Sequence, residues 1–303
     1  MKSQREKPFF NFGRNKKMNN ITLTIGDFIL QLQSKHDLFI EPGYEPFVSE
    51  NQSSKPNVTI ECFESAEFIA PAKKEMIFEA ADENLRYYSI FRIGNDFIFE
   101  VFDQQENAFI QQIALVNSDF THWKIYSEKN LDNELVPLLY PLGPIIMQYM
   151  TINSDAIMIH ASCVFDGKKG RIFAGFSGAG KSTMAKIWAE EGYQIINDDR
   201  LLIRRQGDVF FVYNTPMYYA DSPKRVPLNS IFLIHQSPVN DIKKISGALA
   251  VSKTLAFCIQ NNFDSTIIMN NLKFMSDICA KTPVYALGVV PNKKIIDFIF
   301  ENE

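Results

Sequence analysis

The chain has 303 residues, of which 46% are hydrophobic, 13% aromatic and 22% charged, and its formal net charge is −4. This length is enough for two domains with a large buried core, and the apolar content excludes a disordered protein except at the ends. The weak negative charge gives no overall reason to expect nucleic acid or an anionic membrane as a partner.

The N-terminal segment, residues 1–19, has six basic residues and one acid, Glu6, without an apolar pattern. We interpret it as a disordered basic tail, because it lacks the apolar core of a signal peptide and the pattern of a transit peptide. No apolar run approaches the roughly 18 residues that a membrane helix needs, so we expect a soluble, cytoplasmic protein. The four cysteines are widely spaced, which favours free thiols over a disulfide framework or a metal site. They are Cys62, Cys163, Cys258 and Cys279.

Residues 20–128 alternate apolar and polar side chains in short runs separated by turn signals, which predicts a small antiparallel β-rich domain. No catalytic pattern occurs in this region, and its aromatic residues are explained by core packing. The predicted strands are Ile21–Ile25, Asn57–Cys62, Tyr88–Ile93 and Phe97–Phe102.

Residues 129–303 have a different pattern, which predicts a second domain of the α/β class (α+β for the whole chain) with a mixed sheet. Its first part, Asn130–Met150, has helical periodicity interrupted by Pro141 and Pro144. Strands are then predicted at Ala156–Phe165, Arg171–Ala174, Tyr193–Asn197, Gly207–Tyr213 and Val284–Val290, and helices at Thr183–Glu191 and Lys293–Phe300.

The segment from Gly175 to Ser182 reads GFSGAGKS and matches the phosphate-binding loop G-x-x-x-x-G-K-[ST]. A strand is predicted before it and a helix after it, so the helix N-terminus and the loop N–H groups would face an anion. The pattern indicates a site for the phosphates of a nucleotide beside a metal ion; a Gly-rich turn without a ligand is the alternative. The predicted nucleotide-binding residues are Gly175, Phe176, Ser177, Gly178, Ala179, Gly180, Lys181, Ser182 and Thr183.

Two acids, Asp198 and Asp199, follow the predicted strand Tyr193–Asn197. We expect them at the carboxyl end of a parallel strand, where α/β sheets bind their ligands. Phosphoryl transfer uses one acid to bind Mg²⁺ and another to accept the proton of the attacking group. The alternative is that the two acids form a solvated turn.

His160, the Gly175–Ser182 loop and the run Asp198-Asp199-Arg200 resemble the catalytic domain of HPr kinase/phosphorylase in order and spacing. The resemblance covers roughly residues 145–300 and includes a Thr-Pro element, Thr215-Pro216. The loop is also similar to that of ATP-dependent phosphoenolpyruvate carboxykinase. The resemblance implies a P-loop kinase domain that uses ATP and Mg²⁺.

Residue roles are implied by the same resemblance. Asp198 would be the general base, Ser182 and Asp199 would hold Mg²⁺, and Lys181 would neutralise the β/γ-phosphates. His160 would lie beside the acids; a buried strand histidine bonded to backbone is the alternative.

The chain lacks the Arg-Gly-Leu-Gly-Ile-Ile type of segment that follows the acids in HPr kinases, so HPr itself is not predicted as the acceptor. Four cations are candidates for charge stabilisation, or else are solvated strand-end charges: Arg204, Arg205, Lys224 and Arg225.

The leading hypothesis is therefore a kinase that phosphorylates a serine or another hydroxyl of a peptide, protein or small molecule. A nucleotide-binding regulatory protein without transfer activity and a carboxykinase-like enzyme are the alternatives. The paired acids favour transfer, because a protein that only binds nucleotide needs no base. Neither a nucleic acid nor a membrane is an expected partner, and the sequence leaves a homo-oligomer open.

Overall fold

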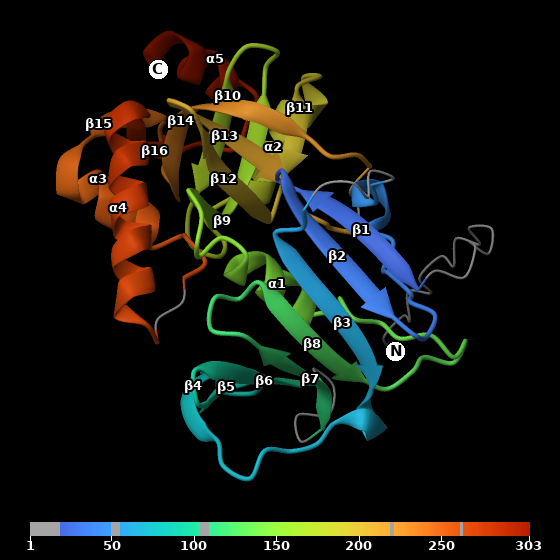
Figure 1. The fold of residues 1–303 in the computed structure, drawn as a ribbon. Helices are drawn as coiled ribbons and strands as arrows, with labels where there is room; N and C mark the ends of the chain where they lie inside the picture. The colour runs from blue at the N-terminus through green and yellow to red at the C-terminus, as the bar shows by residue number, and fades with distance from the viewer. Residues whose placement is uncertain (1–18, 50–54, 104–108, 219–220, 261–262) are drawn as a thin grey trace.

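The computed structural model describes residues 19–49, 55–103, 109–218, 221–260 and 263–303. It contains two mixed sheets of eight strands each (Figure 1). Almost all of the predicted basic tail, residues 1–19, lies outside the described residues. Among the described helices, none combines the length and the apolar character needed to cross a membrane.

The N-terminal sheet has the strand order β1-β2-β3-β8-β7-β6-β5-β4. Its strands are β1 (Asn20–Ile25), β2 (Phe28–Ser34), β3 (Val58–Glu64), β4 (Glu75–Ala81), β5 (Arg86–Ile93), β6 (Asp96–Phe102), β7 (Ile110–Val116) and β8 (His122–Ser127), with short 3₁₀ turns at Glu45–Phe47 and Ser65–Glu67.

The prediction that this sheet is antiparallel is wrong at two pairings. β3 runs parallel to both of its neighbours, β2 and β8. The long connection between Ser34 and Val58 explains the difference, because a parallel pair needs a crossover of about a dozen residues or more, whereas a hairpin needs only two. Alternation of apolar residues shows which face of a strand is buried, but it does not show the direction of its neighbour.

The connector between the sheets is less helical than predicted. Only α1 (Leu142–Tyr149) forms within residues 130–150, with Pro141 at its N-cap. A proline at that position costs no intrahelical hydrogen bond, because the first N–H groups of a helix have no partner within it, so the helix can begin just after Pro141. Almost every residue of α1 is buried, because the helix lies where the two sheets meet (Figure 1).

The second sheet combines antiparallel hairpins with two parallel pairings, β10 with β14 and β14 with β16. Its strands are β9 (Ala156–Phe165), β10 (Gly170–Ala174), β11 (Gln194–Asn197), β12 (Arg200–Gln206), β13 (Val209–Asn214), β14 (Arg225–Gln236), β15 (Asp241–Ile245) and β16 (Val284–Val289). Its helices are α2 (Lys181–Glu190), α3 (Gly247–Leu255), α4 (Ser265–Lys281) and α5 (Lys294–Asn302).

One buried cluster crosses from the first sheet to the second. Met158, Leu202 and Tyr213 of the second sheet belong to the same core as the apolar side chains of β1–β8 and α1. A separate cluster packs α2 and α5 around Phe173 and Trp188. The division of the chain at residues 128 and 129 stays a prediction, and the structure adds that the two parts share apolar core.

Candidate functional site

The central strand β9 brings the candidate site together. β10 and β11 both pair antiparallel with it, on either side, so their carboxyl ends reach the same edge. Ala174, the last residue of β10, pairs with Ala161, and Arg200, the first residue of β12, pairs with His160. The Gly-rich loop after β10 and the acids before β12 therefore leave the sheet beside His160.

The acids lie in a different setting from the one predicted. β11 pairs antiparallel with β9, not parallel to a neighbour. β12 pairs with the next part of β9, also antiparallel. Asp198 and Asp199 form a short bend between β11 and β12. The backbone oxygen of Asp199 still accepts a hydrogen bond from Ala161 N at 3.0 Å. Such interruptions re-aim side chains away from the regular alternation of a strand, which lets adjacent acids face one site.

The loop itself is shaped by glycine. Gly178 and Gly180 have φ values of 79° and 104°, a region that other residues rarely adopt. A Cβ on Gly175 would lie 2.9 Å from the carbonyl oxygen of Ile234 in β14, so only glycine fits between the strands. From the end of β14, Gln236 Nε2 donates to Gly178 O at 3.0 Å and ties the loop to the sheet.

Lys181 begins α2 and turns its side chain back over the loop. Its Nζ donates to Gly175 O at 2.9 Å and to Phe176 O at 3.3 Å. In the described structure no acceptor faces the backbone N–H groups of Gly180, Lys181 and Ser182. The loop thus combines a cation with unused N–H donors at a helix N-terminus, the arrangement that binds phosphate.

Asp198 contacts the start of the same helix. The Ser182 hydroxyl lies close enough to its carboxylate to lower the pKa, but burial and the neighbouring charge of Asp199 raise the pKa, and burial is the largest effect. The net result is a pKa above the ordinary value for aspartate. The Oδ1 atom of Asp198 is buried and has no hydrogen-bond partner within the described residues.

Asp199 lies between two other site residues. Its Oδ1 is 3.6 Å from His160 Nε2, and its Oδ2 is 3.2 Å from the Arg200 guanidinium. The His160 side chain is 53% exposed, so it is not the buried strand histidine that was the alternative. Burial of the imidazole and the nearby Lys181 charge lower the pKa of His160, against the opposing effect of Asp199.

A buried polar network holds the bend that carries the acids. Asn197 Oδ1 accepts from Asp198 N at 2.9 Å, and Asn197 Nδ2 donates to Arg200 O at 2.7 Å. Thr215 Oγ1 donates to the same carbonyl at 2.8 Å. Thr215 belongs to the Thr-Pro element recognised in the sequence, whereas Asn197 was missed, because an asparagine at a strand end carries no sequence signal of its own.

Most of the cations proposed from the sequence have partners elsewhere. Arg204 Nη1 donates to Gly26 O at 2.8 Å, Arg205 pairs with Asp277 at 2.5 Å, and Arg225 stacks on Phe211. Lys224 binds Asp221 and the Ile195 carbonyl. The cation that contacts the acidic pair is Arg200, which the sequence analysis did not select as a charge-stabilising residue.

An aromatic pair flanks the loop. Phe176 is 76% exposed, and its ring meets that of Phe257 edge-on, with 5.1 Å between centroids. The Phe257 carbonyl accepts a hydrogen bond from His160 N at 2.9 Å, so the segment after α3 lies directly beside the candidate site. Ser177, Ser182 and Thr183 are exposed, and Ala179 is half-buried.

The residues present fit a nucleotide bound with Mg²⁺. An ion held chiefly by phosphates and water needs only one or two protein oxygens, and the Ser182 hydroxyl with the unpartnered Asp198 oxygen supplies them. Within the described residues there is no cluster of three or more His, Cys, Asp or Glu side chains that would form a metal centre without such a ligand.

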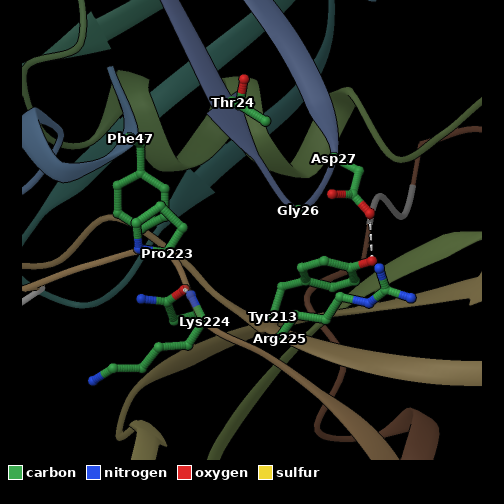
Figure 2. Close-up of a pocket in the computed structure, with 9 residues that line it drawn as sticks. Thr24, Gly26, Asp27, Phe47, Tyr213, Pro223, Lys224 and Arg225 are labelled. Carbon is green, nitrogen blue, oxygen red and sulfur yellow. Dashed lines mark hydrogen bonds between the residues drawn. The ribbon is translucent and has the colours of Figure 1, made fainter. Parts of the chain in front are cut away.

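A cavity of about 110 Å³ lies away from this site, between the β1–β2 turn and the strands β13 and β14 (Figure 2). Its lining includes Asp27 and Tyr213, which are hydrogen-bonded to each other. No residue of the Gly-rich loop or of the acidic pair lines it.

No protein-family model matches the sequence, and no curated protein matches it. Among solved structures, the chain is similar to the HPr(Ser) kinase/phosphatase from Coxiella burnetii, with 10% identity and a TM-score of 0.29 over 48% of this chain and 94% of that chain. A likeness at that level carries no argument about function, so the function proposed for this chain rests on its own residues.

Proposed function

We propose that the protein is an ATP- and Mg²⁺-dependent phosphotransferase that transfers the γ-phosphoryl group to a hydroxyl of a peptide, protein or small molecule. The observation that carries the proposal is the contact between Ser182 and Asp198, which leaves one buried Asp198 oxygen without a partner, within the described residues, beside a loop of unused N–H donors. A buried unpaired carboxylate oxygen is costly, so a site that keeps one is prepared for a cation or a proton.

The loop residues would hold the phosphates. Among the residues that the structure describes, none accepts from the N–H groups of Gly180, Lys181 and Ser182. Lys181 Nζ donates to the carbonyls of Gly175 and Phe176. Transferring the ammonium from those carbonyls to a phosphate exchanges neutral acceptors for a charged one. Both kinds of hydrogen bond use the charged ammonium, but only the phosphate adds attraction between opposite charges, so the exchange favours binding.

The acidic pair would divide the work of binding the metal ion and accepting the proton. When bound, Mg²⁺ would neutralise charge on the transferring phosphoryl group. The raised pKa and free oxygen of Asp198 support the base role that the sequence assigned to it. Its contact with Ser182 supports the opposite assignment, in which Asp198 binds the metal ion and Asp199 accepts the proton. The proposal retains both assignments, and asparagine variants separate them.

His160 and Arg200 would orient Asp199. The two side chains contact different oxygens of its carboxylate, which restricts its rotation. Because the pKa of His160 is lowered, the imidazole is neutral at pH 7 and can either donate or accept a proton. Arg200 carries a guanidinium group, so it can also stabilise charge on the reacting group.

The test is transfer of labelled phosphate. Purified protein is incubated with γ-labelled ATP, Mg²⁺ and a fractionated cell extract, and label in phosphoester linkage is followed. We expect label in an acceptor with the parent protein and none with Lys181→Ala. Binding of ATP without any transfer, to extract or to water, would contradict the proposal and favour the nucleotide-binding regulatory protein instead.

A further inference from the structure

The turn between β1 and β2 docks against the strands that carry the candidate site. Gly26 and Asp27 form this two-residue turn, with φ values of 57° and 61°. A Cβ on Gly26 would lie 2.1 Å from Leu202 Cδ2 in β12, so the backbone of the turn touches the second sheet. Leu202 is completely buried there.

Polar contacts fasten the same turn. The Asp27 carboxylate accepts a hydrogen bond from the Tyr213 hydroxyl at 2.5 Å (Figure 2) and another from Gln206. The Gly26 carbonyl accepts from Arg204 Nη1 at 2.8 Å. Turns at the tip of a hairpin are normally solvated and mobile, so this set of contacts needs an explanation.

The strands that the turn contacts are the ones that hold the acidic bend. Leu202 and Tyr213 pair with each other in the register of β12 and β13. In the same register, Leu201 pairs with Asn214, one step nearer to the bend, and Thr215 then donates to the Arg200 carbonyl at 2.8 Å. A short, buried and hydrogen-bonded path therefore joins the turn to the residues that flank Asp198 and Asp199.

We propose that Gly26 and Asp27 are positioning residues, through which the N-terminal sheet fixes the β12–β13 pair and thereby the placement of Asp198 and Asp199. The catalytic part of this inference rests on the proposed function. The structural part does not: it states that loosening the turn loosens the acidic bend. A cavity of about 110 Å³ adjoins the turn, so a substitution that removes one of these contacts leaves space for the turn to move.

The N-terminal sheet offers a matched control. Gly94, in the β5–β6 turn, has a φ of 62°, close to that of Gly26, but a Cβ there would meet nothing within 4 Å. Gly26→Ala and Gly94→Ala therefore impose similar backbone strain, and only Gly26→Ala disturbs the contact with β12. Asp27→Ala removes the Tyr213 bond and provides a second variant if Gly26→Ala fails to fold. Because Asp27 also has a positive φ, alanine there adds some backbone strain, for which Gly94→Ala is again the control.

The first readout is amide hydrogen exchange of the full-length chain without nucleotide, in peptides that cover residues 194–201. We expect exchange there to accelerate on the order of tenfold in Gly26→Ala and Asp27→Ala, and to stay at the parent rate in Gly94→Ala. Equal exchange in all the variants would overturn the proposal. This readout does not depend on whether the protein transfers phosphate.

The second readout is hydrolysis of Mg²⁺·ATP, with kcat and KM measured separately. A displaced acidic bend should lower kcat on the order of tenfold in Asp27→Ala and leave KM for ATP near the parent value, because the loop is not displaced. Asp27→Asn retains an acceptor for Tyr213 and should restore most of kcat. If the Tm of a turn variant falls while kcat per folded molecule is unchanged, the turn contributes to stability only and does not position the acidic bend. If the parent turns over no ATP either alone or with the cell extract, the proposed function fails, and the exchange experiment still decides the structural claim.

Discussion

The Ser182 hydroxyl, in the first turn of α2, lies close enough to the carboxylate of Asp198, in the bend before β12, to lower the pKa of that acid. This proximity brings the Gly-rich loop and the acidic pair together, although the two come from separate segments on opposite sides of β9. The Oδ1 atom of Asp198 is buried without a partner in the described structure. The two elements therefore form one site, with an acid that is poised to take up a proton or a cation.

The acidic pair is tested by two asparagine variants. If Asp198 is the base, Asp198→Asn should lower kcat roughly a hundredfold or more and leave the Mg²⁺ dependence unchanged, because general base catalysis contributes about that much. Asp199→Asn should then raise the Mg²⁺ concentration needed for half-maximal activity. Steady-state rates across a Mg²⁺ titration measure both effects.

If Asp198→Asn instead raises the Mg²⁺ requirement and Asp199→Asn lowers kcat, Asp198 binds the metal ion and Asp199 accepts the proton. Asp241→Asn is the control, because Asp241 lies in β15, away from the acidic bend. If both site variants keep the parent rate and the parent Mg²⁺ dependence, the pair has no catalytic role.

The pH dependence of stability follows from Asp198. Burial raises its pKa above 3.8, the ordinary value for an aspartate, so the folded protein retains this proton to a higher pH than the unfolded chain. The stabilisation that this group contributes is complete below the unfolded-chain pKa of 3.8, and it is lost as the pH rises through the pKa of the folded state. Asp198→Asn cannot ionise, so its Tm relative to the parent should increase between about pH 4 and pH 7. Thermal unfolding across that range measures the difference.

For Asp208→Asn, the Tm relative to the parent should instead decrease as the pH rises, with a small amplitude and only below about pH 4. A hydrogen bond from Lys281 lowers the pKa of Asp208, so the parent contact is lost as the pH falls. A Tm difference for Asp198→Asn that stays constant over the range would show that this carboxyl has an ordinary pKa.

A buried ion network behind the loop should dominate stability. Arg171, at 2% side-chain exposure, pairs with Asp166 at 2.7 Å and with Glu303 at 2.8 Å, and Glu303 itself is 6% exposed. Arg171→Met would leave both carboxylates without their buried cation, which should cost about 3–5 kcal/mol. Lys186→Met removes an exposed pair with Glu190 at 3.8 Å and should cost less than about 0.5 kcal/mol. Urea unfolding compares the two; similar costs would contradict the buried network.

The sequence predicts the local parts of this site better than their assembly. Glycine spacing and an apolar strand before the loop are enough to place β10, the loop and α2, because these depend on neighbouring residues. The contact between Ser182 and Asp198 depends on how two segments flank β9, and periodicity holds no information on that arrangement. In the same way, Arg200 and Arg204 are equivalent strand cations in the sequence, yet one reaches Asp199 and the other binds Gly26 of the first sheet.

Calorimetric binding of Mg²⁺·ATP to the parent, Lys181→Ala and Lys186→Ala is the most direct test of the proposed nucleotide site. Lys181→Ala removes a charge-assisted phosphate contact worth about 2–4 kcal/mol, which is at least about a thirtyfold rise in Kd. Lys186→Ala, on the exposed face of the same helix, should bind as the parent does. Under the proposed function, the parent binds Mg²⁺·ATP and only Lys181→Ala loses this binding, while the Tm of Lys181→Ala shows that the variant is folded. Equal affinity of Lys181→Ala and the parent, or no binding by the parent, would contradict the proposed function.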